Sequence, residues 1–141
     1  MIDGIVLCIL LFEGLSDIRY RSVSGIRILV FGVLGILINI FWCYQTLWSI
    51  VGGVVVGLIL LVYAFFTKGA VGIGDGIMFV CLGIYLGTSR NIKLLFLSLV
   101  VAAVVGIVMV IVKKKSIKSQ IPFVPCILLA YTAMLIMEVI A

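Results

Sequence analysis

The sequence predicts an all-α, polytopic membrane protein with six transmembrane helices and with both termini facing outward. Hydrophobic residues make up 66% of the 141 residues, against about 45–50% in soluble domains, and the mean hydropathy is +1.52. Only 15 residues are charged, 10 basic and 5 acidic, which is too few to cover the surface of a soluble domain. We therefore expect one domain over residues 1–141, with a core formed between helices in lipid.

The first half of the chain predicts three of the six helices. Residues 2–16 form an apolar run that contains Glu13. At about 22 Å as a helix it is shorter than the membrane core, so we expect it either to tilt little or to be buried among neighbouring helices. Residues 28–67 are 40 residues without a charge, enough for two spans of about 20 residues each. The polar and aromatic group 42–46 marks the turn between them, and Trp48 beside it suits the membrane interface.

The second half predicts three more helices. A glycine-rich turn at 69–76 precedes a short apolar run that predicts a helix over 77–87. The polar segment 88–93 is expected to be a connection, and 94–112 is an uncharged run long enough to span the membrane. The last helix is expected to begin at the proline-containing segment 121–125, because proline suits the first turn of a helix, where its missing N–H would have no partner.

The basic residues predict the orientation. Cytoplasmic connections of membrane proteins carry an excess of lysine and arginine. In a six-span arrangement only Arg90 and Lys93 fall on one side, and the other eight basic residues fall on the opposite side, which we assign to the cytoplasm. Those eight are Arg19, Arg21, Arg27, Lys68, Lys113, Lys114, Lys115 and Lys118. The net charge of +5 therefore reflects the orientation of the chain in the lipid bilayer of the cell's inner membrane. We expect no nucleic-acid partner.

The cysteine and histidine content bears on cofactors. The chain has no histidine, and its four cysteines stand singly in or beside apolar runs, without a CxxC pair. These cysteines are Cys8, Cys43, Cys81 and Cys126. Isolated thiols of this kind behave as small hydrophobic residues, and no spacing here matches a metal site. We expect neither a metal nor a cofactor.

Two aspartates lie where membrane proteins rarely keep acidic groups. Asp17 directly follows the first apolar run, and Asp75 ends the sequence Gly72-Ile73-Gly74-Asp75. Although 58 positions separate them, the six-span topology puts both at cytoplasmic helix ends and therefore at the same depth. Because acidic groups near lipid are costly, they mark candidate functional sites.

Two carboxyl groups held close together in a poorly solvated site tend to share one proton. The charged one takes a proton from water while the protonated one donates to the carbonyl under attack, which is the chemistry of an aspartic protease. Gly72 and Gly74 would allow backbone angles closed to other residues and let a substrate strand lie beside Asp75. In the alternative interpretation Asp75 caps a helix and the glycines form an ordinary loop.

Three motifs together resemble the type IV prepilin peptidase family. They are Asp17-Ile18-Arg19-Tyr20-Arg21, Gly72-Ile73-Gly74-Asp75 and Ile121-Pro122-Phe123-Val124-Pro125. The resemblance covers nearly the whole chain. It implies a membrane aspartic endopeptidase that cleaves the basic leader of prepilins or pseudopilins at the cytoplasmic membrane face, after a glycine and before the hydrophobic pilin helix. It also implies Asp17 and Asp75 as the catalytic pair.

The chain departs from the family pattern in several places. Ile77 stands where many members have a lysine or arginine, Val23-Ser24 where they have Ile-Pro, and Val124 where they have glycine. Longer members carry a cytoplasmic insertion with paired CxxC motifs, associated with methylation of the mature N-terminus. Because no such insertion is present, we expect a form that acts only as a peptidase.

Further candidates for positioning the substrate, besides the two glycines, are Glu13, Arg19, Arg21, Pro122 and Pro125. Glu13 lies one helical turn before Asp17 on the same face. It either influences the protonation of Asp17 or pairs in the interior with an arginine or Lys68. Arg19 and Arg21 either contact the substrate or hold the anionic membrane surface.

Two other functions remain open from the sequence. Presenilin-like intramembrane proteases share GxGD, but they carry a Pro-Ala-Leu motif near the C-terminus where this chain has Pro122-Phe123-Val124-Pro125. A non-enzymatic subunit for membrane assembly or transport would instead use its aspartates for structure or ion handling. The sequence specifies neither an oligomeric state nor the individual substrate.

Overall fold

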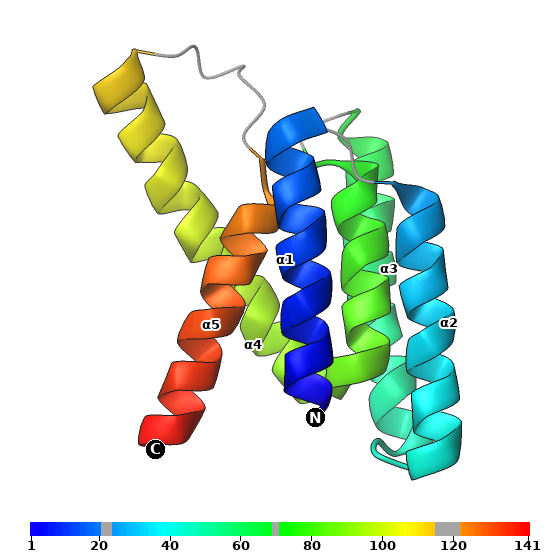
Figure 1. Ribbon diagram of the computed structural model, residues 1–141. Coiled ribbons are helices and arrows are strands. Elements are labelled where there is room, and N and C mark those ends of the chain that lie inside the picture. Colours follow the sequence, from blue (N-terminus) through cyan, green and yellow to red (C-terminus); the bar gives the residue numbers. More distant parts are fainter. Residues whose placement is uncertain (21–23, 69–70, 115–121) are drawn as a thin grey trace.

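The computed structural model describes residues 1–20, 24–68, 71–114 and 122–141, and their regular structure is entirely helical (Figure 1). The helices are α1 (Ile2–Tyr20), α2 (Gly25–Trp42), α3 (Leu47–Phe66), α4 (Ile73–Lys113) and α5 (Val124–Ile140). Within the described residues, three segments are long and apolar enough to cross a membrane: Gly25–Trp42, Leu47–Phe66 and Ile73–Val112. The prediction of an all-α protein with the character of a membrane protein is confirmed.

α4 is bent back on itself at Gly87. This residue has φ 70° and ψ −175°, a non-helical conformation inside the helix, and φ in this range is open to glycine at little cost. The segments 73–86 and 88–113 run in opposite directions along the bundle (Figure 1). A Cβ at Gly87 would also lie 2.8 Å from Oε1 of Gln45. The predicted end of a helix at residue 87 is confirmed.

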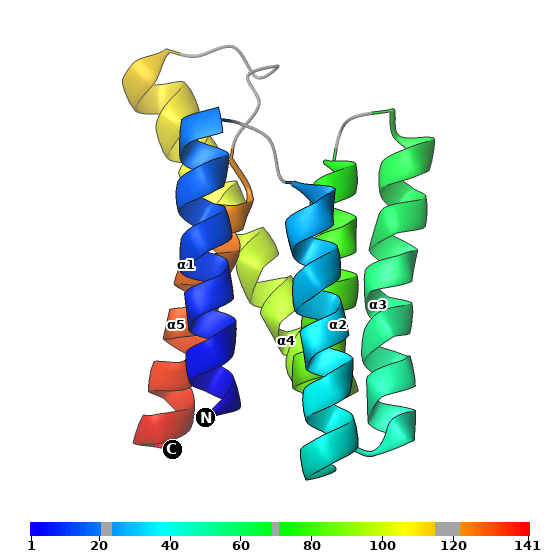
Figure 2. The same cartoon turned by 45° about the vertical axis from the view of Figure 1, so that its right-hand side comes forward.

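The predicted connection at 88–93 is wrong, because these residues are helical and begin the second segment of α4, which runs back along the bundle (Figure 2). Their polarity reflects partners on other helices. Thr88 donates from Oγ1 to the carbonyl of Ser49 (2.9 Å), and the buried Asn91 donates from Nδ2 to the carbonyl of Gly53 (2.9 Å). Polar side chains between membrane helices form such interhelical hydrogen bonds, so a polar run here indicates helix packing, not a loop.

Two further boundaries are corrected at the end of the bundle that carries the aspartates. α1 continues to Tyr20 instead of ending at residue 16, so Asp17 lies within a helix. α4 begins at Ile73 instead of residue 77, so Asp75 lies in its first turn. In both places charged and glycine residues suggested a connection, but they occupy the ends of helices; Asp17 there faces the start of α5, and Arg19 is exposed.

Glycines bring α3 and the first segment of α4 into close contact. A Cβ at Gly57 would collide with the backbone of Val80, and one at Gly53 would collide with the backbone of Gly83. Small residues at spacing four permit this close approach of helices in membranes. The buried core lies where α1, α4 and α5 meet and includes Val6, Leu10, Phe79, Leu82, Ile127 and Tyr131.

An ionic cluster closes the end of the bundle at which both termini lie (Figure 1). Asp3 accepts hydrogen bonds at Oδ1 from Nη1 of Arg90 (3.0 Å) and from the hydroxyl of Tyr131 (2.8 Å). Arg90 also forms an ion pair with Glu138. The cluster therefore joins α1, α4 and α5.

Candidate active site

The two aspartates lie at the same end of the bundle, opposite the termini. Asp17 belongs to the last turn of α1 and Asp75 to the first turn of α4, and Figure 1 shows that these helix ends are on the same side of the molecule. Two residues 58 positions apart in the sequence are therefore brought to one end of the fold.

Asp17 is held against the start of α5. Its side chain is buried, and Oδ2 accepts a hydrogen bond from the backbone N–H of Val124 (3.4 Å). Gly14, one turn earlier, faces the same segment, since a Cβ there would be in ordinary van der Waals contact with the backbone nitrogen of Pro125 (3.9 Å). The first N–H groups of a helix have no partner within the helix and carry its positive dipole end, so the start of α5 stabilises a negative charge on Asp17.

Asp75 lies at the third position of α4, and Gly72 is the capping residue. The Gly72 carbonyl accepts hydrogen bonds from the backbone N–H groups of Asp75 (3.1 Å) and Gly76 (3.4 Å). The expectation of unusual backbone angles at Gly72 and Gly74 is wrong, because Gly72 has φ −67° and Gly74 lies in the helix without positive φ. Gly72 instead leaves room for the carboxylate: a Cβ there would lie 2.9 Å from Oδ2 of Asp75.

The two carboxylates and a thiol share one environment. The charge of Asp17 acts electrostatically on Asp75, and the Cys126 thiol lies within electrostatic range of both aspartates. Cys126 is buried in the first turn of α5, where its sulfur lies 3.6 Å from the carbonyl oxygen of Pro122. From the sequence Cys126 is expected to be a small hydrophobic residue, whereas here it lies beside the aspartates; its place directly after Pro125 is the sequence signal for this position.

Glu13 forms an ion pair with the partly exposed Arg27, one helical turn before Asp17. The side chain of Glu13 is fully buried, and its two oxygens accept from Nε (3.0 Å) and Nη2 (3.3 Å) of Arg27. Nη2 also donates to the hydroxyl of Ser16 (2.7 Å). The interior pairing with an arginine is confirmed. Arg27, which in the sequence indicates only the membrane orientation, is that arginine.

The remaining predicted residues lie at the end of α1 and around the start of α5. Arg19 is exposed at the end of α1, with its guanidinium 5.6 Å from the ring centroid of Tyr20. Pro122 precedes α5 and Pro125 lies in its first turn, as predicted for proline. The ring of Phe123 packs against that of Phe79 in α4, with 6.4 Å between centroids. The described residues contain no group of three or more acidic, cysteine or histidine side chains that could hold a metal ion.

Some predicted features lie outside the described residues: Arg21, Val23, residues 69 and 70 of the glycine-rich turn, Lys115, Lys118 and Ile121.

Comparison with known proteins identifies a family. The family model described as the type IV leader peptidase family matches residues 4–111, which is 108 of the 141 residues. The matched range includes Asp17 and Asp75, and it ends before the segment that opens α5. Neither the curated proteins nor the solved structures gave a match.

Proposed function

Since this chain belongs to the type IV leader peptidase family, we propose that it is an aspartic endopeptidase that removes the basic leader of a prepilin or pseudopilin. The family is one of peptidases that process prepilin-type substrates, and the apolar helices make this member a membrane-embedded protein. The proposal adds the aspartic mechanism, the catalytic pair Asp17 and Asp75, and cleavage at the cytoplasmic membrane face.

The observation that carries the proposal is how the five acidic residues are paired. Asp3, Glu13 and Glu138 each form an ion pair with an arginine. Among the described residues, Asp17 and Asp75 have no such partner, and the charge of one acts on the other. Acidic groups near lipid are normally neutralised by a cation unless they serve a function, so this pair is the best candidate for catalysis.

The proposed reaction uses one proton shared between Asp17 and Asp75. The ionised carboxylate accepts a proton from a water molecule as that water attacks the scissile carbonyl carbon, and the protonated carboxyl donates to the carbonyl oxygen. As the C–N bond of the tetrahedral intermediate breaks, the first carboxyl returns its proton to the departing amine nitrogen, and the second carboxylate takes a proton back from a hydroxyl of the gem-diol, which restores the starting state of the pair. The N–H of Val124 holds Asp17 in place during these steps, and the start of α5 supplies positive potential.

The topology that fits this reaction has six spans. Counting the two segments of α4 separately, the chain crosses the inner membrane six times, with both termini outside and the aspartates at the cytoplasmic surface. The basic residues support this orientation, because Arg19 and Lys68 adjoin the aspartate end.

The substrate would lie over the start of α4 and α5. Gly72 and Gly74 leave space for a peptide strand beside Asp75, and Pro122 and Pro125 set the position of α5 next to Asp17. Arg19, with Arg21, would contact the leader or the surrounding headgroups. Glu13 would contribute indirectly, because its ion pair with Arg27 fixes the end of α1 that carries Asp17.

The direct test is cleavage in a cell that expresses this protein together with a prepilin whose basic leader ends in glycine. We expect a size shift of the prepilin on an immunoblot, and we expect Asp17→Asn and Asp75→Asn each to abolish it. Asp3→Asn is the matched control, because it makes the same chemical change at the other end of the bundle and should leave cleavage intact.

Each alternative has its own outcome in this test. Cleavage that survives in either aspartate variant would remove the pair from the mechanism. An untouched prepilin together with cleavage of a transmembrane reporter within its span would favour a presenilin-like protease. The absence of any cleavage, with the protein present in the membrane, would favour a non-enzymatic subunit.

A further inference from the structure

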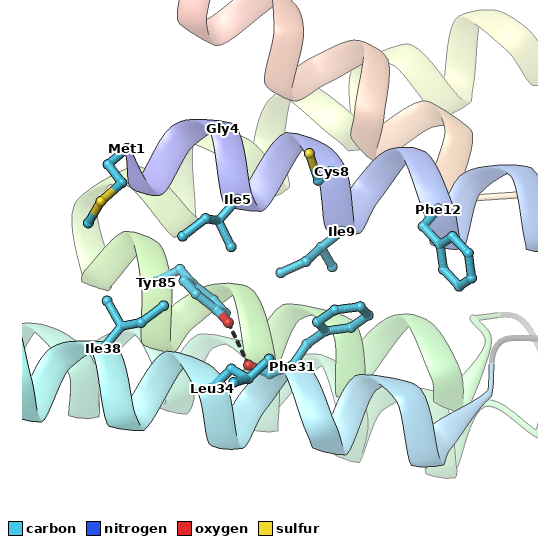
Figure 3. Close-up of a pocket in the computed structure, with 10 residues that line it drawn as sticks. All are labelled: Met1, Gly4, Ile5, Cys8, Ile9, Phe12, Phe31, Leu34, Ile38 and Tyr85. Carbon is cyan, nitrogen blue, oxygen red and sulfur yellow. Dashed lines mark hydrogen bonds between the residues drawn. The ribbon is translucent and has the colours of Figure 1, made fainter.

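An apolar groove runs along the bundle between α1 and α2. Figure 3 shows side chains of the two helices pointing toward one another across it, with Tyr85 of α4 behind them. Its walls include Ile5, Ile9 and Phe12 of α1 and Phe31, Leu34 and Ile38 of α2. The cavity has a volume of about 660 Å³, within the ~300–1,000 Å³ range of ligand pockets.

The groove offers an occupant almost no hydrogen bonds. The one polar side chain at its back, Tyr85, donates its hydroxyl proton to the carbonyl of Phe31 (2.6 Å) (Figure 3). Because that hydroxyl is already engaged, the groove favours an apolar guest. The lining residues recur every three or four positions along both helices. Side chains at this spacing form grooves into which the side-chain ridges of a third helix can pack.

The groove leads toward the catalytic centre along the helix that carries Asp17. Phe12 lies at the end of the groove nearest the site, five residues or about 7.5 Å of helix before Asp17. Beyond this end the next side chains are charged: the guanidinium of Arg27 lies 5.4 Å from the centre of the Phe12 ring and pairs with the buried Glu13. Along α1, the apolar groove is thus followed by the polar site. In a membrane-anchored substrate, the apolar segment is likewise followed by the polar leader.

We infer that this groove binds the apolar helix of the substrate immediately after the scissile bond. The inference rests on the proposed function and adds the surface that holds the substrate in register. A substrate cut at Asp17 and Asp75 and anchored in lipid has to continue into the membrane beside the end of α1. The groove offers that path a matching shape and polarity, whereas a lipid acyl chain would match the polarity alone.

Cross-linking tests the occupant. Ile5 lines the groove, and Leu11 lies on α1 but is exposed away from it. Each is replaced by cysteine in a background in which the exposed Cys8 and Cys43 are serine and Asp17→Asn prevents turnover. The partner is a prepilin with a single cysteine in its apolar segment. Because Ile5 lies 12 residues from Asp17, we expect the strongest disulfide adduct about 12 residues, or ~18 Å of helix, after the scissile bond, at Ile5→Cys and not at Leu11→Cys.

Filling the groove provides a kinetic test. Leu34 lines the groove and Ile36 does not, and the two side chains have similar exposure, 44% and 48%. Leu34→Trp is expected to raise KM for the full-length prepilin about tenfold, a loss of ~1.4 kcal/mol of binding. Ile36→Trp, and either variant acting on a leader peptide without the apolar segment, should be unchanged.

The outcomes separate this inference from the proposed function. If the wild type cleaves prepilin but the Ile5→Cys adduct does not exceed that of Leu11→Cys, the inference is overturned. It is also overturned if a photoreactive acyl chain labels the groove and prepilin does not compete with it. A wild type that cleaves no prepilin would instead count against the proposed function, whatever the adducts show.

Discussion

The two ends of the bundle handle acidic residues in opposite ways. At the end with the termini, Asp3 and Glu138 share Arg90, and Tyr131 adds a hydrogen bond to Asp3. At the other end, the charge of Asp17 acts on Asp75, and within the described ranges neither forms an ion pair. The first arrangement joins three helices. The second leaves two carboxyl groups without a neutralising cation, as the proposed catalytic pair requires.

The largest expected effect is on catalysis at the unpaired end. Asp17→Asn and Asp75→Asn should each lower kcat/KM by about 10³-fold or more, since each removes one half of a proton-transfer pair that contributes roughly 10²–10⁴-fold per group. The double variant should be no worse than the poorer single variant, because the two groups act as a unit. Cleavage kinetics in detergent-solubilised membranes measure this. Additive losses would mean that the aspartates act independently.

Removing the cation from the buried pair should have the next largest effect, this time on stability. Arg27→Met leaves the Glu13 carboxylate buried without its partner, which costs about 3–5 kcal/mol. Adding Glu13→Gln should restore much of that loss, because the buried charge is then absent. Thermal unfolding of the purified variants compares them. If the single and double variants have the same Tm, the pair would not contribute as the geometry indicates.

Gly87→Ala tests the reversal that positions the first segment of α4. The positive φ alone costs roughly 1–2 kcal/mol for a residue with a Cβ, and contact with Ser49 and Gln45 adds to it. We expect a lower Tm and lower abundance in the membrane. Gly4→Ala is the matched control, since a Cβ at Gly4 meets no atom within 4 Å; equal stability of the two variants would contradict the conformation of Gly87.

The smallest effect is expected at the paired end. Glu138→Gln should change stability by only about 0–1 kcal/mol, because its side chain is 43% exposed and Arg90 keeps Asp3 as a partner. Cleavage should be unaffected. A large loss of activity in this variant, with the protein still folded, would mean that the two ends are coupled and that the comparison is too simple.

The sequence predicted the helical membrane character, because long apolar runs are local signals. It also predicted that Asp17 and Asp75 lie at the same end of the bundle, because the number of apolar runs between them fixes on which side each one falls. It misjudged segments in which polar residues lie inside helices. Thr88, Arg90 and Asn91 suggested a loop, yet each finds its partner on another helix. No local pattern distinguishes a polar residue that faces water from one that hydrogen-bonds a distant helix.

What the sequence determined by itself is the set of apolar helices. Unpaired backbone N–H and C=O groups are costly in lipid, and a helix pairs them all within one segment, so long uncharged runs form helices. Tertiary structure alone decided which charges meet. Glu13 and Arg27 pair across two helices, α5 brings Val124 to Asp17, and Gly87 turns α4 back along the bundle. Those contacts depend on how helices pack, and packing is set by side chains far apart along the chain.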